Sequence, residues 1–242
     1  GGIHTITASD YAGVSPGVTF TITSDITLSA NTGAVGSTFT VSGTGFALGS
    51  TLSFFLDSTA ISATANTDAT GNFSNVTITI PTISGGTHNF KVQDALGNSV
   101  TKSFSVTATM TVSPTTGPID TTVAITGKGF LASSPITVTY DGATVISLLS
   151  LASATDGSIN TSFKIPASAS GAHVITVSDG TTTLNANFTT SSTSAISVTS
   201  GPVGTSVTAS GSGFKNKGNI TITYNNAQVG TATADTKGNF IT

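Results

Sequence analysis

Three histidines recur along the chain at nearly equal intervals, which makes them the first candidates for chemistry. His4, His88 and His173 are 84 and 85 residues apart. Histidine is a common metal ligand, but no second histidine or carboxylate stands near any of the three at the spacing of a metal site. Because His88 shares strand parity with Phe90 and Val92, we expect it to cap a hydrophobic core instead.

Aspartates in turns form a second candidate set. Asp57 lies in LDST, Asp68 in TDATGN and Asp94 in VQDALGN. Aspartate is favoured in turns because its side chain accepts hydrogen bonds from nearby backbone amides. If the three side chains gather at one loop end, they could also bind calcium, which prefers carboxylate oxygens. The spacing is not that of an EF-hand, so we expect no cofactor, with calcium as the open alternative.

The stretch ITGKGF (125–130) places Lys128 between two glycines, as a phosphate-binding loop would. The same stretch recurs at 41–46 and 209–214, with threonine or serine in place of the lysine. A phosphate loop would be followed by a helix, whereas the pattern that follows here is that of a strand. We therefore expect the glycines to permit a tight bend. The phenylalanine that follows should then tuck under the end of a sandwich, at Phe46, Phe130 and Phe214.

The composition excludes several classes of function. The chain has 242 residues and a formal net charge of −3, only 7% of its residues are charged, and it contains no Glu, Arg, Cys or Trp. Without a basic cluster, nucleic-acid binding is not expected. The densest apolar run, VISLLSLA (145–152), is too short to span a bilayer, so we expect no membrane insertion, and no signal peptide is visible. Turn aspartates and the absence of a G-x-S-x-G elbow argue against an enzyme.

A tandem repeat underlies all of these spacings. Gly45, Gly129 and Gly213 are 84 residues apart, as are the phenylalanines that follow them. Within each repeat, short runs alternate apolar and polar residues and are separated by turn residues. This pattern is typical of antiparallel sandwiches. It predicts an all-β chain of tandem immunoglobulin-like β-sandwiches with about 84 residues per repeat.

Two phrases carry a resemblance to a known family. SPTTGPIDTTVAITGKGF (113–130) and TSGPVGTSVTASGSGF (199–214) resemble the IPT/TIG-type immunoglobulin-like repeats of prokaryotic cell-surface proteins. The resemblance extends over the chain, repeat by repeat, and implies the immunoglobulin-like fold. In that family, such modules usually act as spacers, adhesive stalks, or wall and filament components, and a few bind partners. The resemblance implies a role of this kind here.

The repeat divides the chain into four segments. Residues 26–109 and 110–193 read as whole repeats, 1–25 as the closing strands of a partial repeat, and 194–242 as the opening strands of another. No flexible linker intervenes, which predicts a stiff rod. A half sandwich would expose its core, so two hypotheses stay open. The chain is a window on a longer array, or its partial repeats complete each other between molecules in a head-to-tail fibre.

Two further sets of residues are candidates for modification and assembly. An apolar insertion in the second whole repeat is either an extended hairpin packed on its own repeat or a contact for a neighbouring subunit. Its members are Val145, Ile146, Leu148, Leu149 and Leu151. Five N-x-S/T sequons are candidate glycosylation sites, at Asn72, Asn75, Asn160, Asn187 and Asn219.

The sequence thus predicts a structural segment of an extracellular filament, surface layer or cell-surface rod. We expect copies of the chain to be its partners, with glycans as a further possibility. Two alternatives remain. One is an adhesin or glycan-binding stalk, which would need an exposed aromatic cluster. The other is a passive spacer beside an extracellular enzyme domain.

Overall fold

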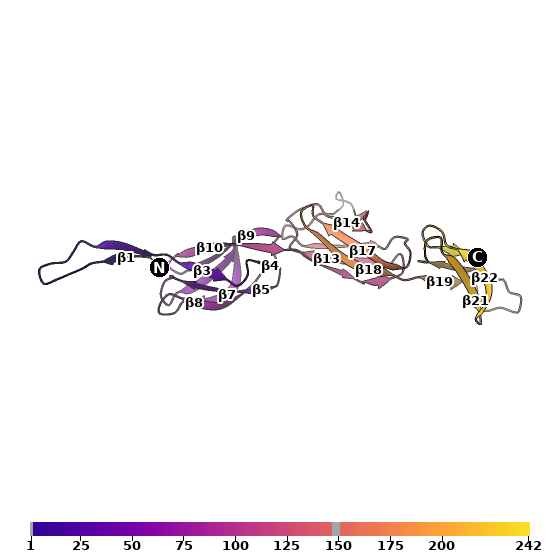
Figure 1. Ribbon diagram of the computed structural model, residues 1–242, viewed down its shortest axis with the longest axis horizontal. Helices are drawn as coiled ribbons and strands as arrows, with labels where there is room; N and C mark the ends of the chain where they lie inside the picture. The colour runs from indigo at the N-terminus through magenta and orange to yellow at the C-terminus, as the bar shows by residue number, and fades with distance from the viewer. Residues whose placement is uncertain (1, 147–150) are drawn as a thin grey trace. The chain divides into compact units, whose positions relative to one another are not determined.

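A computed structural model describes residues 2–146 and 151–242, and the regular elements of these residues are β-strands (Figure 1). The chain is therefore all-β, as predicted. Contacts divide it into two compact units. The first takes in residues 1–109, 128–132 and 155–157, and the second takes in the remainder. The four segments expected from the repeat describe a finer division and stay a prediction.

The first unit holds one β-sandwich of two sheets. Its three-stranded sheet has the order β3 (Asp25–Leu28), β5 (Thr38–Thr44) and β8 (Phe73–Thr79). Its five-stranded sheet has the order β4 (Thr32–Ala34), β10 (Ser99–Thr107), β9 (Gly86–Asp94), β6 (Thr51–Leu56) and β7 (Thr59–Asn66). Ahead of the sandwich stands a two-stranded hairpin of β1 (Gly2–Ile6) and β2 (Val18–Ile22).

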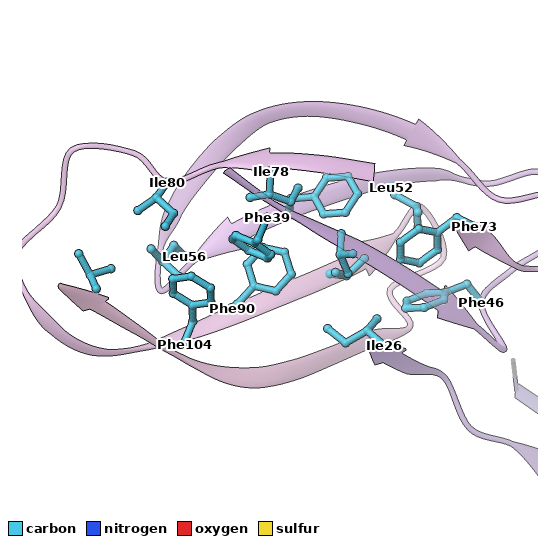
Figure 2. Packing of buried hydrophobic residues seen from close by; sticks show 14 residues of the cluster. Ile26, Phe39, Phe46, Leu52, Leu56, Phe73, Ile78, Ile80, Phe90 and Phe104 are labelled. Atoms are coloured by element: carbon cyan, nitrogen blue, oxygen red, sulfur yellow. The ribbon is translucent and has the colours of Figure 1, made fainter. Parts of the chain in front are cut away.

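Phenylalanine fills the core of this sandwich. Phe39 stacks on Phe104 with ring centroids 4.6 Å apart and meets Phe90 edge-on at 5.2 Å. Figure 2 shows these side chains, with Ile78 and Leu56, between the strands of the two sheets. The alternating pattern of the sequence produces this core, because successive side chains of a strand point to opposite faces.

The second unit repeats the plan with smaller core residues. Val123, Val138 and Ile175 are fully buried where the first sandwich has Phe39, Phe54 and Phe90. One sheet has the order β11 (Thr109–Ser113), β13 (Thr122–Lys128) and β16 (Ile159–Lys164). The other has the order β12 (Thr116–Gly117), β18 (Thr183–Thr190), β17 (Gly171–Ser178), β14 (Thr137–Tyr140) and β15 (Ala143–Ile146).

The second unit ends in two small sheets. The first has the order β19 (Thr193–Ile196), β20 (Ala209–Ser212) and β23 (Phe240–Ile241), and the second pairs β21 (Asn219–Tyr224) with β22 (Ala227–Thr233). In the residues that the structure describes, no strand pairs with the free edge of β21. We call residues 193–242 the half sandwich.

The registers confirm the duplication strand by strand. His4 pairs with Phe20 in the β1–β2 hairpin, as His88 pairs with Phe104 in β9–β10. The β17–β18 hairpin has the same pair at His173 and Phe188. The opening strands agree as well, since Leu28 pairs with Val41 and Ile196 with Ala209. We call residues equivalent when they hold the same register position in their repeats.

The glycines of the repeated bend have the structural role expected of them. Gly45 and Gly129 have φ angles of +74° and +70°, a region that side chains rarely adopt. Phe46 and Phe130 that follow them are fully buried, and Phe214 packs edge-on against Phe240 at 5.2 Å. The backbone N–H of each of the three phenylalanines donates to a glycine carbonyl, at Gly71, Gly157 and Gly238. Lys128 is therefore one variant of a structural bend.

Connections between consecutive repeats are short. Two residues separate β2 from β3, one separates β10 from β11, and two separate β18 from β19. This agrees with the absence of flexible linkers in the sequence, whereas the stiff rod stays a prediction. Among the described residues, no helix is long and apolar enough to cross a bilayer.

Candidate association surfaces

His88 is held between two acceptors at the start of its hairpin. Its Nδ1 lies 2.7 Å from Oδ2 of Asp57, and its Nε2 lies 2.9 Å from the carbonyl oxygen of Ser84. The other carboxylate oxygen of Asp57 accepts the backbone N–H of Asn89 at 2.8 Å. Both ring nitrogens therefore face acceptor oxygens. The buried side chain thus ties the start of β9 to the turn after β6.

The second sandwich repeats this arrangement. Nδ1 of His173 lies 2.6 Å from Oδ2 of Asp141, and its Nε2 lies 2.9 Å from the carbonyl oxygen of Ala169. The ring stacks on Tyr140 with centroids 4.9 Å apart. The sequence predicted the core-capping position of these histidines, but the partner was missed. The signal for it was the step of 84 residues from Asp57 to Asp141, which nearly matches the step between the histidines.

Hydrogen bonds keep both carboxylates ionised. The backbone N–H of Asn89, followed by His88, lowers the pKa of Asp57. Desolvation raises the pKa of Asp141, but the hydrogen bonds from His173 and the backbone of Val174 outweigh it, so this pKa is also lowered. These carboxylates act as fixed acceptors that hold the hairpins in place.

The three aspartates considered for calcium do not gather. Leu56 pairs with Phe90 and Leu52 with Asp94, so Asp57 and Asp94 lie near opposite ends of β6. The expectation of one common loop end is therefore wrong for Asp57. Across residues 2–146 and 151–242, no three His, Cys, Asp or Glu side chains come together as a metal site would require. Calcium binding itself stays untested.

Asp68 and Asp94 cap their own turns. Oδ1 of Asp68 accepts the backbone N–H groups of Thr70 and Asn72 at 2.7 and 2.9 Å. Asp94 is buried, and its Oδ1 accepts the N–H groups of Leu96 and Asn98. These contacts are the turn-capping role that the sequence predicts for aspartate.

The sequons lie mainly at exposed positions. Asn75, Asn160, Asn187 and Asn219 are exposed and stand on strands, whereas Asn72 is half-buried and its amide donates to Thr70 Oγ1 at 2.8 Å. Glycosylation at the four exposed asparagines stays a prediction, and Asn72 is the least accessible of the five.

The apolar insertion is described only in part. Val145, on β15, and Leu151 are half-buried, and Leu151 accepts the backbone N–H of Ile136 at its carbonyl oxygen. Ile146 is the last residue of β15, and Leu148 and Leu149 lie outside the described residues. Its role in assembly therefore remains a prediction.

The β1–β2 hairpin exposes side chains that are buried in the equivalent hairpins. Ile6 is 61% exposed and Phe20 is 56% exposed. Their equivalents Phe90 and Phe104 are fully buried. Ile22 is also exposed, whereas its equivalent Val106 is buried. The hairpin therefore presents one face of a sandwich core to solvent.

The half sandwich exposes the complementary positions. Tyr224 is 71% exposed, while its equivalents Leu56 and Tyr140 are buried. No described strand covers β21 as β17 covers β14, which leaves the Tyr224 side chain exposed. Val207 is half exposed, whereas its equivalent Phe39 is buried. Between the two small sheets lies an open pocket, lined in part by Ile196, Ala209, Phe214, Ile220, Ile222 and Phe240.

Comparison with known proteins identifies one domain. Residues 107–193 match the family model described as the IPT/TIG domain. No curated protein matches the chain significantly.

Solved structures of low identity resemble the chain. A tetra-tandem repeat in the extending region of a large adhesion protein is 19% identical, over 100% of this chain and 72% of the other, with a TM-score of 0.36. The protein SGBP-B of Bacteroides ovatus is also 19% identical, over 84% and 59%, with a TM-score of 0.32. The adhesin InvE of Yersinia pseudotuberculosis is 15% identical, over 69% and 58%, with a TM-score of 0.31. The chain spans less than three fifths of the length of the latter two.

Proposed function

We propose that this chain, whose residues 107–193 match the IPT/TIG domain, is a structural repeat segment of an extracellular filament, surface layer or cell-surface rod. The observation that carries the proposal is the tandem arrangement itself. The same strand registers recur along the chain, with two residues or fewer between the closing strand of one repeat and the opening strand of the next. Such connections leave little slack between repeats.

The chemistry of the side chains supports a structural role. The carboxylates of Asp57, Asp94 and Asp141 are occupied by hydrogen bonds from backbone and side-chain donors, which lower their pKa values. A general acid or base at neutral pH needs a pKa shifted toward 7, which is the opposite direction for a carboxyl group. We infer that these aspartates hold turns and hairpins, and that the segment is not catalytic.

Low charge suits contacts between copies of the chain. With 7% charged residues and a formal net charge of −3, like-charge repulsion between neighbouring copies is small. The polar faces of the sandwiches are rich in Thr and Ser, which can donate and accept hydrogen bonds across a lateral contact.

Surface localisation can be tested on intact cells of the source organism. Brief trypsin treatment, followed by mass spectrometry of the released peptides, should recover peptides that end at the lysines of this chain, with a cytosolic protein as the control. If peptides of this chain are recovered only after cell lysis, as those of the cytosolic control are, the result would contradict an extracellular role. The intact mass of the extracted polypeptide before and after deglycosylation would test the sequons in the same preparation.

A further inference from the structure

The loop that precedes β9 contacts the glycine bend of the following repeat. The backbone N–H of Gly85 donates to the carbonyl oxygen of Phe130 at 2.7 Å, and both residues belong to the first compact unit. We propose that the peptide group of Ser84 and Gly85 holds the joint between repeats 26–109 and 110–193 rigid, whereas Ser170 leaves the next joint mobile. The inference deepens the proposed structural function and rests on it, because it says which joint of the segment is stiff.

The peptide group between Ser84 and Gly85 makes hydrogen bonds at both of its ends. Its carbonyl oxygen lies 2.9 Å from Nε2 of His88, whose Nδ1 lies 2.7 Å from Oδ2 of Asp57. Its N–H donates to Phe130 of the next repeat. The buried His88 therefore fixes the orientation of the peptide group that contacts the next repeat. Because linked hydrogen bonds polarise one another, the bond from His88 should also strengthen the bond to Phe130.

Position 85 requires glycine because of a close approach between two backbones. A Cβ there would overlap the carbonyl oxygen of Gly129 and lie 3.0 Å from its carbonyl carbon. Both are backbone atoms, which cannot turn aside as the end of a flexible side chain can. Gly85 does not have a left-handed φ, so its backbone conformation alone would accept other residues. The contact with the bend is therefore what selects glycine at position 85.

The following repeat also meets this loop with glycines. Gly157 lies so close that a Cβ there would be 2.8 Å from Cα of Ser84. A Cβ at Gly129 would be 2.7 Å from the carbonyl oxygen of Thr107, in the connection between the two repeats. These residues all belong to the first compact unit. Backbone therefore packs directly on backbone at this joint, which leaves little room for bending.

The next joint differs at the position of Gly85. Its equivalent is Ser170, since each directly precedes the first residue of its hairpin, in β9 and β17. Nε2 of His173 still lies 2.9 Å from the carbonyl oxygen of the peptide group that leads into Ser170. The receiving glycines also recur, at Gly213 and Gly238. The Cβ of Ser170 nevertheless prevents the close approach that Gly85 makes, so the same contact cannot form at this joint.

Distances between paired spin labels test the first joint, because the natural chain contains no cysteine that would also be labelled. The labels are attached to Ser103→Cys and Asn187→Cys, at exposed, equivalent positions of the two whole repeats. The 242-residue chain should give a narrow distance distribution. Gly85→Ala should widen it, because the added Cβ pushes the loop away from the bend. Ser84→Ala is the matched control, since it changes the neighbouring side chain and adds no atom near Gly129.

Amide hydrogen exchange tests the contact itself. The protection factor of the residue 85 amide should fall by about tenfold in Gly85→Ala, which corresponds to the loss of one hydrogen bond. Ser84→Ala should leave this protection factor unchanged.

Ser170→Gly should have the opposite effect at the next joint. With labels at Asn187→Cys and Thr221→Cys, the unsubstituted chain should give a broad distance distribution, which Ser170→Gly should narrow. The substitution only removes atoms, so it tests the inference even if Gly85→Ala fails to fold.

The outcomes separate this inference from the proposed function. A distribution that widens with Gly85→Ala and narrows with Ser170→Gly supports the inference. If Gly85→Ala folds and changes neither the distribution nor the protection factor, the rigid first joint is overturned. If Ser170→Gly does not narrow the second distribution, the role of Ser170 is overturned. Neither result alters surface localisation, because trypsin treatment of intact cells tests that function separately.

Discussion

Oδ2 of Asp94 accepts the backbone N–H of Ala47 at 2.8 Å, although 47 residues separate the two in sequence. The same oxygen accepts the side-chain amide of Asn98 at 2.8 Å. One buried carboxylate thereby joins the end of β9 to the loop that follows the repeated glycine bend. Burial raises the pKa of Asp94, but the hydrogen bonds from Ala47 and Asn98 outweigh it, so the pKa lies below its ordinary value.

This carboxylate should make the first sandwich sensitive to acid. The folded protein favours the ionised form of Asp94 more than the unfolded chain does, so protonation favours unfolding. Its contribution to stability is present above the unfolded pKa of about 3.9 and is lost as the pH falls toward the lower folded value. Asp94→Asn should cost about 1–3 kcal/mol at pH 7, because the amide group that replaces one carboxylate oxygen cannot accept a hydrogen bond. Urea unfolding of both proteins from pH 7 to pH 2 would measure the difference between their free energies of unfolding, which should become smaller in acid. A difference that does not change with pH would contradict this role.

The Asp57–His88 contact should contribute less, because Asp57 is partly exposed. Asp57→Ala removes the acceptor of both His88 and the backbone of Asn89, which should cost about 1 kcal/mol, and the φ of +52° at this position adds the strain of a left-handed alanine. Asp57→Asn keeps one acceptor oxygen and should cost less. Hydrogen exchange of peptides covering 84–92 would detect faster opening in the alanine variant. If these peptides exchange at the same rate in the alanine variant as in the unsubstituted protein, the carboxylate oxygens do not hold the hairpin.

Gly45 tests the bend that recurs three times. Its φ is +74°, and a Cβ there would lie 2.6 Å from the carbonyl oxygen of Thr23. Gly45→Ala should therefore cost more than the roughly 1–2 kcal/mol of a left-handed alanine alone. Gly49→Ala is the matched control, since Gly49 has φ +56° and no heavy atom lies within 4 Å of the position that a Cβ would take there. In thermal unfolding, Gly49→Ala should have a higher midpoint temperature than Gly45→Ala. The reverse order would contradict the close contact between residue 45 and the carbonyl oxygen of Thr23.

Equivalent phenylalanines should respond differently to truncation. Phe104→Ala removes a buried ring that stacks on Phe39 and should cost about 3–5 kcal/mol in the first sandwich. Phe20→Ala removes an exposed ring and should leave the unfolding of a dilute, monomeric chain unchanged. Calorimetry at low concentration would compare the two. A large loss of stability from Phe20→Ala would show that the hairpin is already packed within a single chain.

The fold could be predicted from the repeat period, because each sequence pattern that indicates a strand or a bend recurs at equivalent positions in several repeats. A glycine that recurs at 45, 129 and 213 is far stronger evidence for a bend than any one of them. The pairing of His88 with Asp57 was harder to predict, since it depends on which strands become neighbours across the sheet. The exposure of Tyr224 was harder still. Strand parity identifies the side of the sheet, whereas burial depends on whether another strand covers it.

The contrast between phenylalanine in the first core and valine or isoleucine in the second also bears on refolding. Hairpins of identical register are candidates for exchange between neighbouring repeats, which is a common misfolding route in tandem arrays. The β9–β10 hairpin carries Phe90, a ring that would overfill the space above Val123 and Val138. Overpacking of this kind typically costs about 1–3 kcal/mol. The difference in core side-chain volume should therefore disfavour strand exchange between adjacent repeats while the chain folds.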